Sequence, residues 1–178
     1  VRNRFLSLDP YMRSRMEDAR SYAKPVAVGE VMVGGTVGEI VESRHPRLAV
    51  GDRVNGVLGW QHYAISDGTG LRRLPAGDSI PLSAYLGAVG MPGVTAWYGL
   101  NRILEPVAGQ TLCVSAASGA VGSVVGQLAR IAGSRVVGVA GGEAKCRLVR
   151  ERYGFDACID YKAGRLEADL ADATPDGV

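Results

Sequence analysis

The chain has 178 residues, of which 47% are hydrophobic and 21% are charged, and its formal net charge is +2. These values exclude an intrinsically disordered chain, which combines low hydrophobicity with high net charge, and they exclude the strongly basic balance of a nucleic-acid-binding protein. Glycine is the unusual component: the chain contains 25 glycines, about twice the usual share, which favours tight turns and ligand-binding loops.

Cysteine usage indicates the cellular compartment. The three cysteines, Cys113, Cys146 and Cys158, are an odd number and none stands in a Cys-x-x-Cys motif, so we expect no disulfide framework. This favours a reducing compartment, and we predict a cytoplasmic protein. The chain begins at Val1, without an initiator methionine or the apolar segment of a signal peptide, so we expect it to be part of a longer polypeptide.

Two uncharged stretches, residues 79–101 and 106–129, exceed the roughly 20 residues that a membrane-spanning helix needs. Both are rich in glycine, and the first also contains Pro81 and Pro92. Small and turn-forming residues at this density favour loops and close packing in a soluble core. We therefore predict no membrane span.

The first part of the chain has the pattern of a small antiparallel β unit between Val26 and about Leu74. Short apolar runs alternate with glycines, and Asp67-Gly68 is a turn signal. The runs that we expect to be extended are Val31–Gly35, Val37–Val41, Asp52–Gly59 and Trp60–Ile65.

The pattern lengthens after Pro81. Ser83–Leu100 is predicted to be mostly helical, with an interruption around Met91-Pro92-Gly93, because proline lacks a backbone donor and disfavours helix at the preceding residue. Strands and helices then alternate, which is typical of a parallel sheet. The predicted strands are Thr111–Ser115, Ser134–Ala140 and Ala157–Tyr161, and the predicted helices are Ser123–Ala132 and Glu143–Tyr153. We predict an α/β protein in which a β-rich domain, residues 1–80, precedes the first half of a doubly wound nucleotide-binding domain, residues 81–178.

A glycine loop between a predicted strand and a predicted helix is the strongest functional signal. Aligned to Gly-x-Gly-x-x-Gly, its three positions are Ala117, Gly119 and Gly122. Backbone amides at such a helix start stabilise a phosphate, and glycines let the backbone approach it. The alternatives are a tight turn that binds nothing and the cofactor loop of a methyltransferase.

The end of the next predicted strand favours one dinucleotide over another. NAD-dependent enzymes place an acid there for the ribose 2′-hydroxyl, whereas this chain has Gly141-Gly142, with Glu143 already at the helix start. Lys145 follows in the first helical turn, where a cation opposes the helix dipole. A 2′-phosphate is a suitable partner for this lysine, so we predict NADPH. The alternative is that Lys145 is an ordinary surface lysine.

Metal and nucleophile chemistry is not indicated. The two histidines, His45 and His62, stand in the β-rich part, and the cysteines stand in or beside elements of the nucleotide-binding part. A catalytic zinc needs three side-chain ligands around one open position, so we predict no metal site. Hydride transfer requires neither a metal nor a nucleophile.

Four segments together resemble a known family; they are Leu6-Ser-Leu-Asp-Pro-Tyr-Met-Arg13, Met91-Pro-Gly-Val-Thr-Ala-Trp-Tyr-Gly-Leu100, Ala116-Ala-Ser-Gly-Ala-Val-Gly-Ser-Val-Val-Gly126 and Asp160-Tyr-Lys162. In this order they resemble the zinc-independent medium-chain dehydrogenase/reductases. More narrowly, they resemble the branch with prostaglandin reductase (leukotriene B4 12-hydroxydehydrogenase), bacterial curcumin reductases and plant alkenal double-bond reductases. Family members are longer at both ends, so we expect this chain to lack a complete active site. The family more often has Asn-Tyr-Lys where this chain has Asp160-Tyr161-Lys162.

The resemblance implies a GroES-like catalytic domain, a Rossmann domain and a homodimer. It implies NADPH-dependent reduction of the carbon–carbon double bond of an α,β-unsaturated ketone or aldehyde, with hydride going to the β-carbon and a proton to the α-carbon. The alternatives are a quinone oxidoreductase of the same superfamily, a non-catalytic nucleotide-binding relative and an inactive fragment.

The resemblance also assigns roles to individual residues. The pyrophosphate would lie on Gly119, Ala120, Val121 and Gly122, the 2′-phosphate on Lys145, and the phosphate region of the cofactor against Tyr161. Met91 and Thr95 would lie near the nicotinamide, and Tyr11 would face the substrate pocket. Each of the last four has a structural alternative: Tyr161 as a half-buried strand residue, Met91 and Thr95 as packing at a helix kink, and Tyr11 as a core or interface aromatic.

Overall fold

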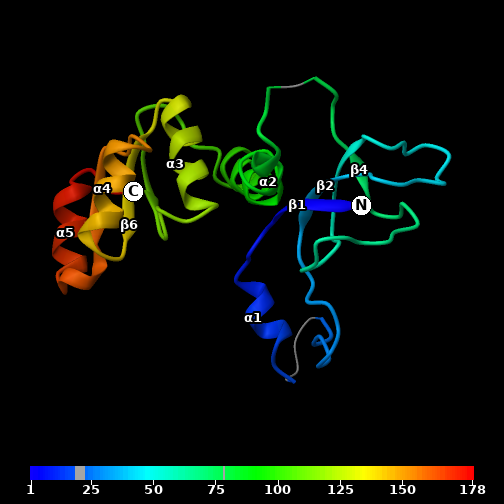
Figure 1. Cartoon of the computed structure of the whole chain (residues 1–178). Coiled ribbons are helices and arrows are strands. Elements are labelled where there is room, and N and C mark those ends of the chain that lie inside the picture. Colours follow the sequence, from blue (N-terminus) through cyan, green and yellow to red (C-terminus); the bar gives the residue numbers. More distant parts are fainter. Residues whose placement is uncertain (19–22, 78) are drawn as a thin grey trace. The chain divides into compact units, whose positions relative to one another are not determined.

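Two hydrophobic clusters form in separate parts of the chain. The computed structural model describes residues 1–18, 23–77 and 79–178, and it divides into two units, Val1–Leu86 and Gly87–Val178 (Figure 1). The core of the first unit contains Val37, Leu74 and Tyr85, with Leu82 and Leu86 packed against them. The core of the second unit contains Leu100, Val114, Ala117, Ala129, Val136, Val149 and Phe155.

The first unit contains an antiparallel sheet in the order β1-β2-β3-β4. Its strands are β1 (Arg2–Leu6), β2 (Thr36–Glu39), β3 (Arg53–Gly56) and β4 (Arg72–Arg73). Gly38 lets β1 approach closely, because a Cβ atom there would overlap the carbonyl oxygen of Arg2. The predicted antiparallel unit is therefore present, and β1 is an additional strand that precedes the predicted start at Val26.

Two of the predicted extended runs do not form strands. Val31–Gly35 and Trp60–Ile65 lie in loops, apart from an isolated bridge between Arg2 and Tyr63. These loops bond to each other instead, because the Trp60 amide donates to the Met32 carbonyl at 2.8 Å. The short apolar runs thus pack as adjoining loops, and the prediction of strands there was wrong.

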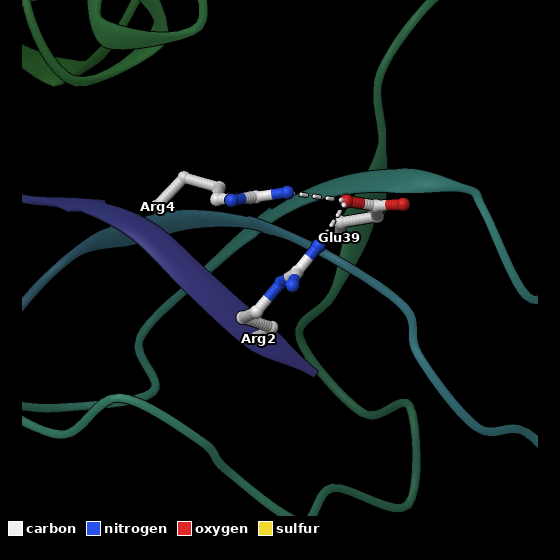
Figure 2. A network of polar contacts seen from close by, with 3 residues as sticks. All are labelled: Arg2, Arg4 and Glu39. Atoms are coloured by element: carbon white, nitrogen blue, oxygen red, sulfur yellow. Dashed lines mark hydrogen bonds and ion pairs between the residues drawn. The ribbon is translucent and has the colours of Figure 1, made fainter.

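An ion-pair network joins β1 to β2 on the first sheet. Glu39 Oε2 accepts hydrogen bonds from Arg4 at 3.1 Å and from Arg2 at 3.2 Å, as Figure 2 shows. Arg2 and Glu39 are direct partners across the two strands. Hydrogen bonds from Arg4, and then from Arg2, hold the pKa of Glu39 below its ordinary value of 4.5.

Two short helices complete the first unit. The helix α1 (Tyr11–Arg15) follows Pro10, and the 3₁₀-helix η1 (Leu82–Leu86) packs against β2. None of the helices formed by the described residues is both long and apolar enough to cross a membrane.

The second unit begins with α2 (Met91–Tyr98), which continues as the π-helical segment η2 (Gly99–Leu104). Pro92 lies in the first turn of α2, where the amide that proline lacks would have no helical partner. The predicted interruption is present, but it lies at residues 87–90, between η1 and α2, because the helix starts at Met91 and accommodates the proline in its first turn. Gly93 is required there, since a Cβ atom would overlap the Ala88 carbonyl.

A parallel three-stranded sheet in the order β5-β6-β7 forms the centre of the second unit. The strands are β5 (Thr111–Val114), β6 (Arg135–Ala140) and β7 (Ala157–Asp160), and the helices are α3 (Gly122–Ile131), α4 (Glu143–Glu151), the short 3₁₀-helix η3 (Tyr161–Ala163) and α5 (Leu166–Ala173). The predicted alternation of strands and helices is confirmed, with ends that differ by one or two residues. Consequently Tyr161 begins η3 and is not a strand residue.

Close packing of α3 depends on a glycine. A Cβ atom at Gly126 would overlap the ring of Phe155, which is buried in the core of the second unit. The helix therefore lies close to the sheet, where it contacts both β5 and β6.

Candidate functional site

The loop between β5 and α3 is a tight turn held to the next strand. Ala116 has a left-handed backbone conformation with φ +48°, which is uncommon for a residue other than glycine. The Ala117 amide donates to the Val139 carbonyl at 3.0 Å, and the Gly119 amide donates to the Ala116 carbonyl at 2.8 Å. Strain of this kind clusters at functional loops.

The same loop, residues 116–122, forms a cradle that has no room for a side chain at Gly122 and little room for one at Gly119. A Cβ atom at Gly122 would lie 2.5 Å from the Ala116 carbonyl oxygen, and one at Gly119 would lie 3.0 Å from that oxygen. Within the part of the chain that the structure describes, the amides of Ala120 and Val121 have no hydrogen-bond acceptor. Two such donors beside the start of α3 fit an anionic group such as a pyrophosphate.

The end of β6 forms a second, adjacent part of the site. The ring of Tyr161 lies against Gly141, where an added Cβ atom would be 2.8 Å from the tyrosine Oη atom. The Tyr161 side chain is about half exposed, with a relative accessibility of 51%. Gly142 follows with φ +97° and immediately precedes α4. Because β5, β6 and β7 are parallel, the loop after β5 and this turn lie at the same edge of the sheet.

The two charged side chains in the first turn of α4, Glu143 and Lys145, differ in whether they are free to bind a ligand. The Arg150 guanidinium donates to Glu143 Oε1 at 2.7 Å, and this hydrogen bond raises the pKa of Arg150. Glu143 is therefore already engaged on its own helix. Lys145 lies in the first turn of α4 and is exposed. The helix start thus offers an exposed ammonium group and a carboxylate that is partly neutralised.

Two more predicted residues lie on α2 of the same unit. Met91 is the first residue of α2 and is exposed, and the Thr95 hydroxyl donates to the Met91 carbonyl at 2.8 Å. The two side chains meet, since the Thr95 oxygen lies 3.6 Å from the Met91 sulfur. There is no helix kink at this position, because both residues belong to the first turns of α2.

Tyr11 is the one predicted site residue that belongs to the first unit. It is half-buried at the start of α1 in the first unit, and its carbonyl accepts a hydrogen bond from the Ser14 hydroxyl at 2.8 Å. The predicted cofactor residues all belong to the second unit.

The cysteines and acidic residues that the structure describes form no metal cluster. Among residues 1–18, 23–77 and 79–178, no group of three or more His, Cys, Asp or Glu side chains could hold a metal ion. Cys113, Cys146 and Cys158 are free thiols. Burial, and then the neighbouring Cys146 thiol, raises the pKa of the Cys158 thiol to about 12. Burial also raises the pKa of Cys113.

Sequence reasoning assigned no role to Asp160, and for Gly141 it predicted only that the acid of an NAD site is absent. The Asp160 carboxylate bonds to amides of two different turns, and Gly141 provides the surface on which Tyr161 lies. The motif Asp160-Tyr161-Lys162 contains the only sequence signal for the first of these. Its structural role depends on strand pairing, which the motif alone does not reveal.

Two protein-family models match the chain. Residues 1–74 match a family described as the N-terminal domain of oxidoreductase, and residues 120–178 match a family described as zinc-binding dehydrogenase.

Individual proteins and structures are also similar to this chain. It is 52% identical over 178 residues to the NADPH-dependent curcumin reductase of Escherichia coli (strain K12), covering 100% of this chain and 51% of that protein. It is 47% identical over 176 residues to prostaglandin reductase 1 of Rattus norvegicus, with coverages of 97% and 51%. A crystal structure of CurA from Vibrio vulnificus in complex with NADPH has a TM-score of 0.92 at 50% identity, with coverages of 99% and 52%. The chain therefore spans about half the length of the relatives that it matches.

Proposed function

Because the chain belongs to the medium-chain dehydrogenase/reductases, in the branch that includes prostaglandin reductase 1 and curcumin reductase, we propose that the whole protein is an NADPH-dependent oxidoreductase. We propose that it reduces the carbon–carbon double bond of α,β-unsaturated ketones and aldehydes. The observation that carries this proposal is the cradle after β5 together with the end of β6, where Gly141 and Gly142 replace the acid of an NAD site.

Different residues of the second unit bind different parts of the cofactor. The amides of the Gly119, Ala120, Val121 and Gly122 segment bind the pyrophosphate, since two of these amides have no acceptor among the described residues. Lys145 binds the 2′-phosphate through a charge-assisted hydrogen bond, and Tyr161, whose ring lies against Gly141, contacts the phosphate region of the cofactor. Met91 and Thr95 lie near the nicotinamide.

When NADPH is bound, it supplies the hydride that is transferred to the β-carbon of the substrate. The chain's own residues bind and orient the two reactants, which is the main contribution that a protein makes to hydride transfer. Tyr11 faces the substrate pocket in this proposal. Two acids at this edge of the sheet are already engaged, since Glu143 pairs with Arg150 and Asp160 bonds to backbone amides, so neither is offered as a proton donor.

The wider properties of the whole protein are proposals of the same kind. We propose a GroES-like domain at residues 1–80 and a Rossmann domain at residues 81–178, a homodimer, a small-molecule substrate, and a cytoplasmic location. The three free thiols support a reducing compartment.

The direct experiment is to follow NADPH oxidation by the full-length protein with a panel of enones, alkenals and quinones. We expect oxidation with enones and alkenals that is unchanged by a chelator, and a double-bond-reduced product by mass spectrometry. Turnover restricted to quinones would favour the quinone oxidoreductase alternative. Nucleotide binding without any turnover would favour a non-catalytic relative.

A further inference from the structure

Asp160 is the last residue of β7, and one of its carboxylate oxygens joins two turns. Oδ1 accepts a hydrogen bond from the Gly142 amide at 2.7 Å and another from the Lys162 amide at 2.9 Å. The first amide belongs to the turn between β6 and α4, and the second belongs to η3. The parallel register explains this contact, because Asp160 is the partner of Ala140, two residues before Gly142.

The two turns that this oxygen joins carry the groups proposed for the 2′-phosphate end of the cofactor. Gly142 immediately precedes α4, and its positive φ of +97° sets the direction in which the helix and Lys145 leave the sheet. Tyr161 stands in the sequence between Asp160 and Lys162, whose amide makes the second contact, and its ring lies against Gly141. A movement at Asp160 would therefore change the position of Lys145 and of Tyr161 together.

We propose that Asp160 is a positioning residue for cofactor selection: its Oδ1 atom fixes the start of α4 and the Tyr161 ring in the arrangement that prefers NADPH over NADH. The inference rests on the proposed function and deepens it. Asp160 acts through its neighbours, since the oxygen that bonds the amides is directed at the backbone and not left free for a ligand.

The second carboxylate oxygen of Asp160 can be replaced without loss of a hydrogen bond, which makes Asp160→Asn a conservative variant for the test. In the described part of the chain, Oδ2 of Asp160 accepts no hydrogen bond. An asparagine can keep the accepting oxygen at the Oδ1 position and place its amide group at the other. It also removes a negative charge near the proposed phosphate. Asp160→Asn should therefore preserve NADPH binding or strengthen it.

Asp156 provides a matched control at the opposite end of the same strands. Its Oδ2 atom accepts a hydrogen bond from the Val136 amide at 2.7 Å, the same kind of link and the same length as the Asp160 contact. Asp156 precedes β7 and Val136 lies near the start of β6, so this link is remote from the turn before α4. Asp156→Ala therefore measures how much stability the protein loses when a carboxylate–amide hydrogen bond between these strands is removed.

The experiment measures dissociation constants of NADPH and NADH for the full-length protein by titration calorimetry, together with the melting temperature without nucleotide. For Asp160→Ala we expect NADPH binding to weaken about tenfold or more, the scale of one lost charge-assisted contact, and NADH binding to weaken less than threefold. Asp156→Ala should lower the melting temperature and leave the ratio of the two constants unchanged. For Asp160→Asn we expect a preference for NADPH over NADH that equals or exceeds that of the unaltered protein.

A further variant covers the case in which Asp160→Ala does not fold. Asp160→Glu keeps the charge but displaces the accepting oxygen by one methylene, so it should lower the preference for NADPH. The proposal is overturned if Asp160→Ala or Asp160→Glu folds and retains the preference, or if Asp160→Asn loses it. If the unaltered protein binds neither nucleotide, the proposed function itself fails. If it prefers NADPH while the Asp160 variants change nothing, only the role of Asp160 fails.

Discussion

Gly141 illustrates how one missing side chain shapes the candidate site. A Cβ atom there would lie within 3.0 Å of three atoms of the Tyr161 ring and hydroxyl, so the ring occupies the space that any other residue would fill. The close atoms belong to the outer part of a half-exposed side chain, which can swing away. The cost of a substitution should therefore appear in ligand binding more than in stability.

We predict that Gly141→Ala lowers NADPH affinity at least threefold while changing the free energy of unfolding by less than about 1 kcal/mol. Nucleotide titration and urea unfolding measure the two effects. Gly99→Ala is a suitable control, because no atom lies within 4 Å of the added Cβ and the residue belongs to a helix. Unaltered NADPH affinity in Gly141→Ala would show that the Tyr161 ring does not contribute.

Cys158 is expected to be unreactive at neutral pH. The reactive form of cysteine is the thiolate, and a pKa of about 12, against an ordinary value of 9.0, keeps Cys158 protonated. At pH 8 we expect iodoacetamide to modify Cys158 at least about a hundredfold more slowly in the folded protein than in urea, as measured by mass spectrometry of the peptide. Equal rates in both states would contradict this.

At the scale of elements, Glu39 links β1 to the rest of the first sheet. Because its pKa is lowered in the folded state, the stabilisation is present above the ordinary value of 4.5 and is lost as the pH falls below it. We predict that Glu39→Gln removes part of the acid dependence of stability between about pH 5 and pH 3. Urea unfolding at several pH values measures this. Parallel curves for the variant and the unaltered protein would refute the contribution of Glu39.

The elements also show what the sequence can predict. The alternation after Thr111 predicted a parallel sheet correctly, because short continuous apolar runs for the strands and the 3.6-residue spacing of the helices are visible there. The predicted fold class, a GroES-like unit followed by half of a Rossmann domain, is confirmed by the likeness to CurA. The strand β1 escaped prediction because Arg2–Leu6 has no apolar alternation and is mostly exposed.

The candidate site was predictable only in part. The glycine loop and Lys145 could be identified because local spacing places them at helix starts. The role of Asp160 could not, because it depends on the register that pairs β7 with β6 and on two backbone amides far apart in the chain. Pro92 was predicted to interrupt a helix, whereas it lies in the first turn of one. Proline is compatible with both positions, so the residue alone does not distinguish them.

At the scale of the whole molecule, the two units carry different parts of the proposed chemistry. All proposed cofactor residues belong to Gly87–Val178, and the proposed substrate residue Tyr11 belongs to Val1–Leu86. Under the proposed assignment, cofactor preference is determined by the second unit, through β5, β6, β7 and the helices that follow them. It can be tested without knowledge of the substrate.

The most direct measurement is the pair of dissociation constants for NADPH and NADH in the full-length protein and in Lys145→Ala. We predict that the unaltered protein binds NADPH more tightly. The substitution should weaken NADPH binding by roughly 10–150-fold, which corresponds to about 1.5–3 kcal/mol for a charge-assisted hydrogen bond, and NADH binding should change little. Equal losses for the two nucleotides, or no preference in the unaltered protein, would contradict the assignment of a 2′-phosphate site at the start of α4.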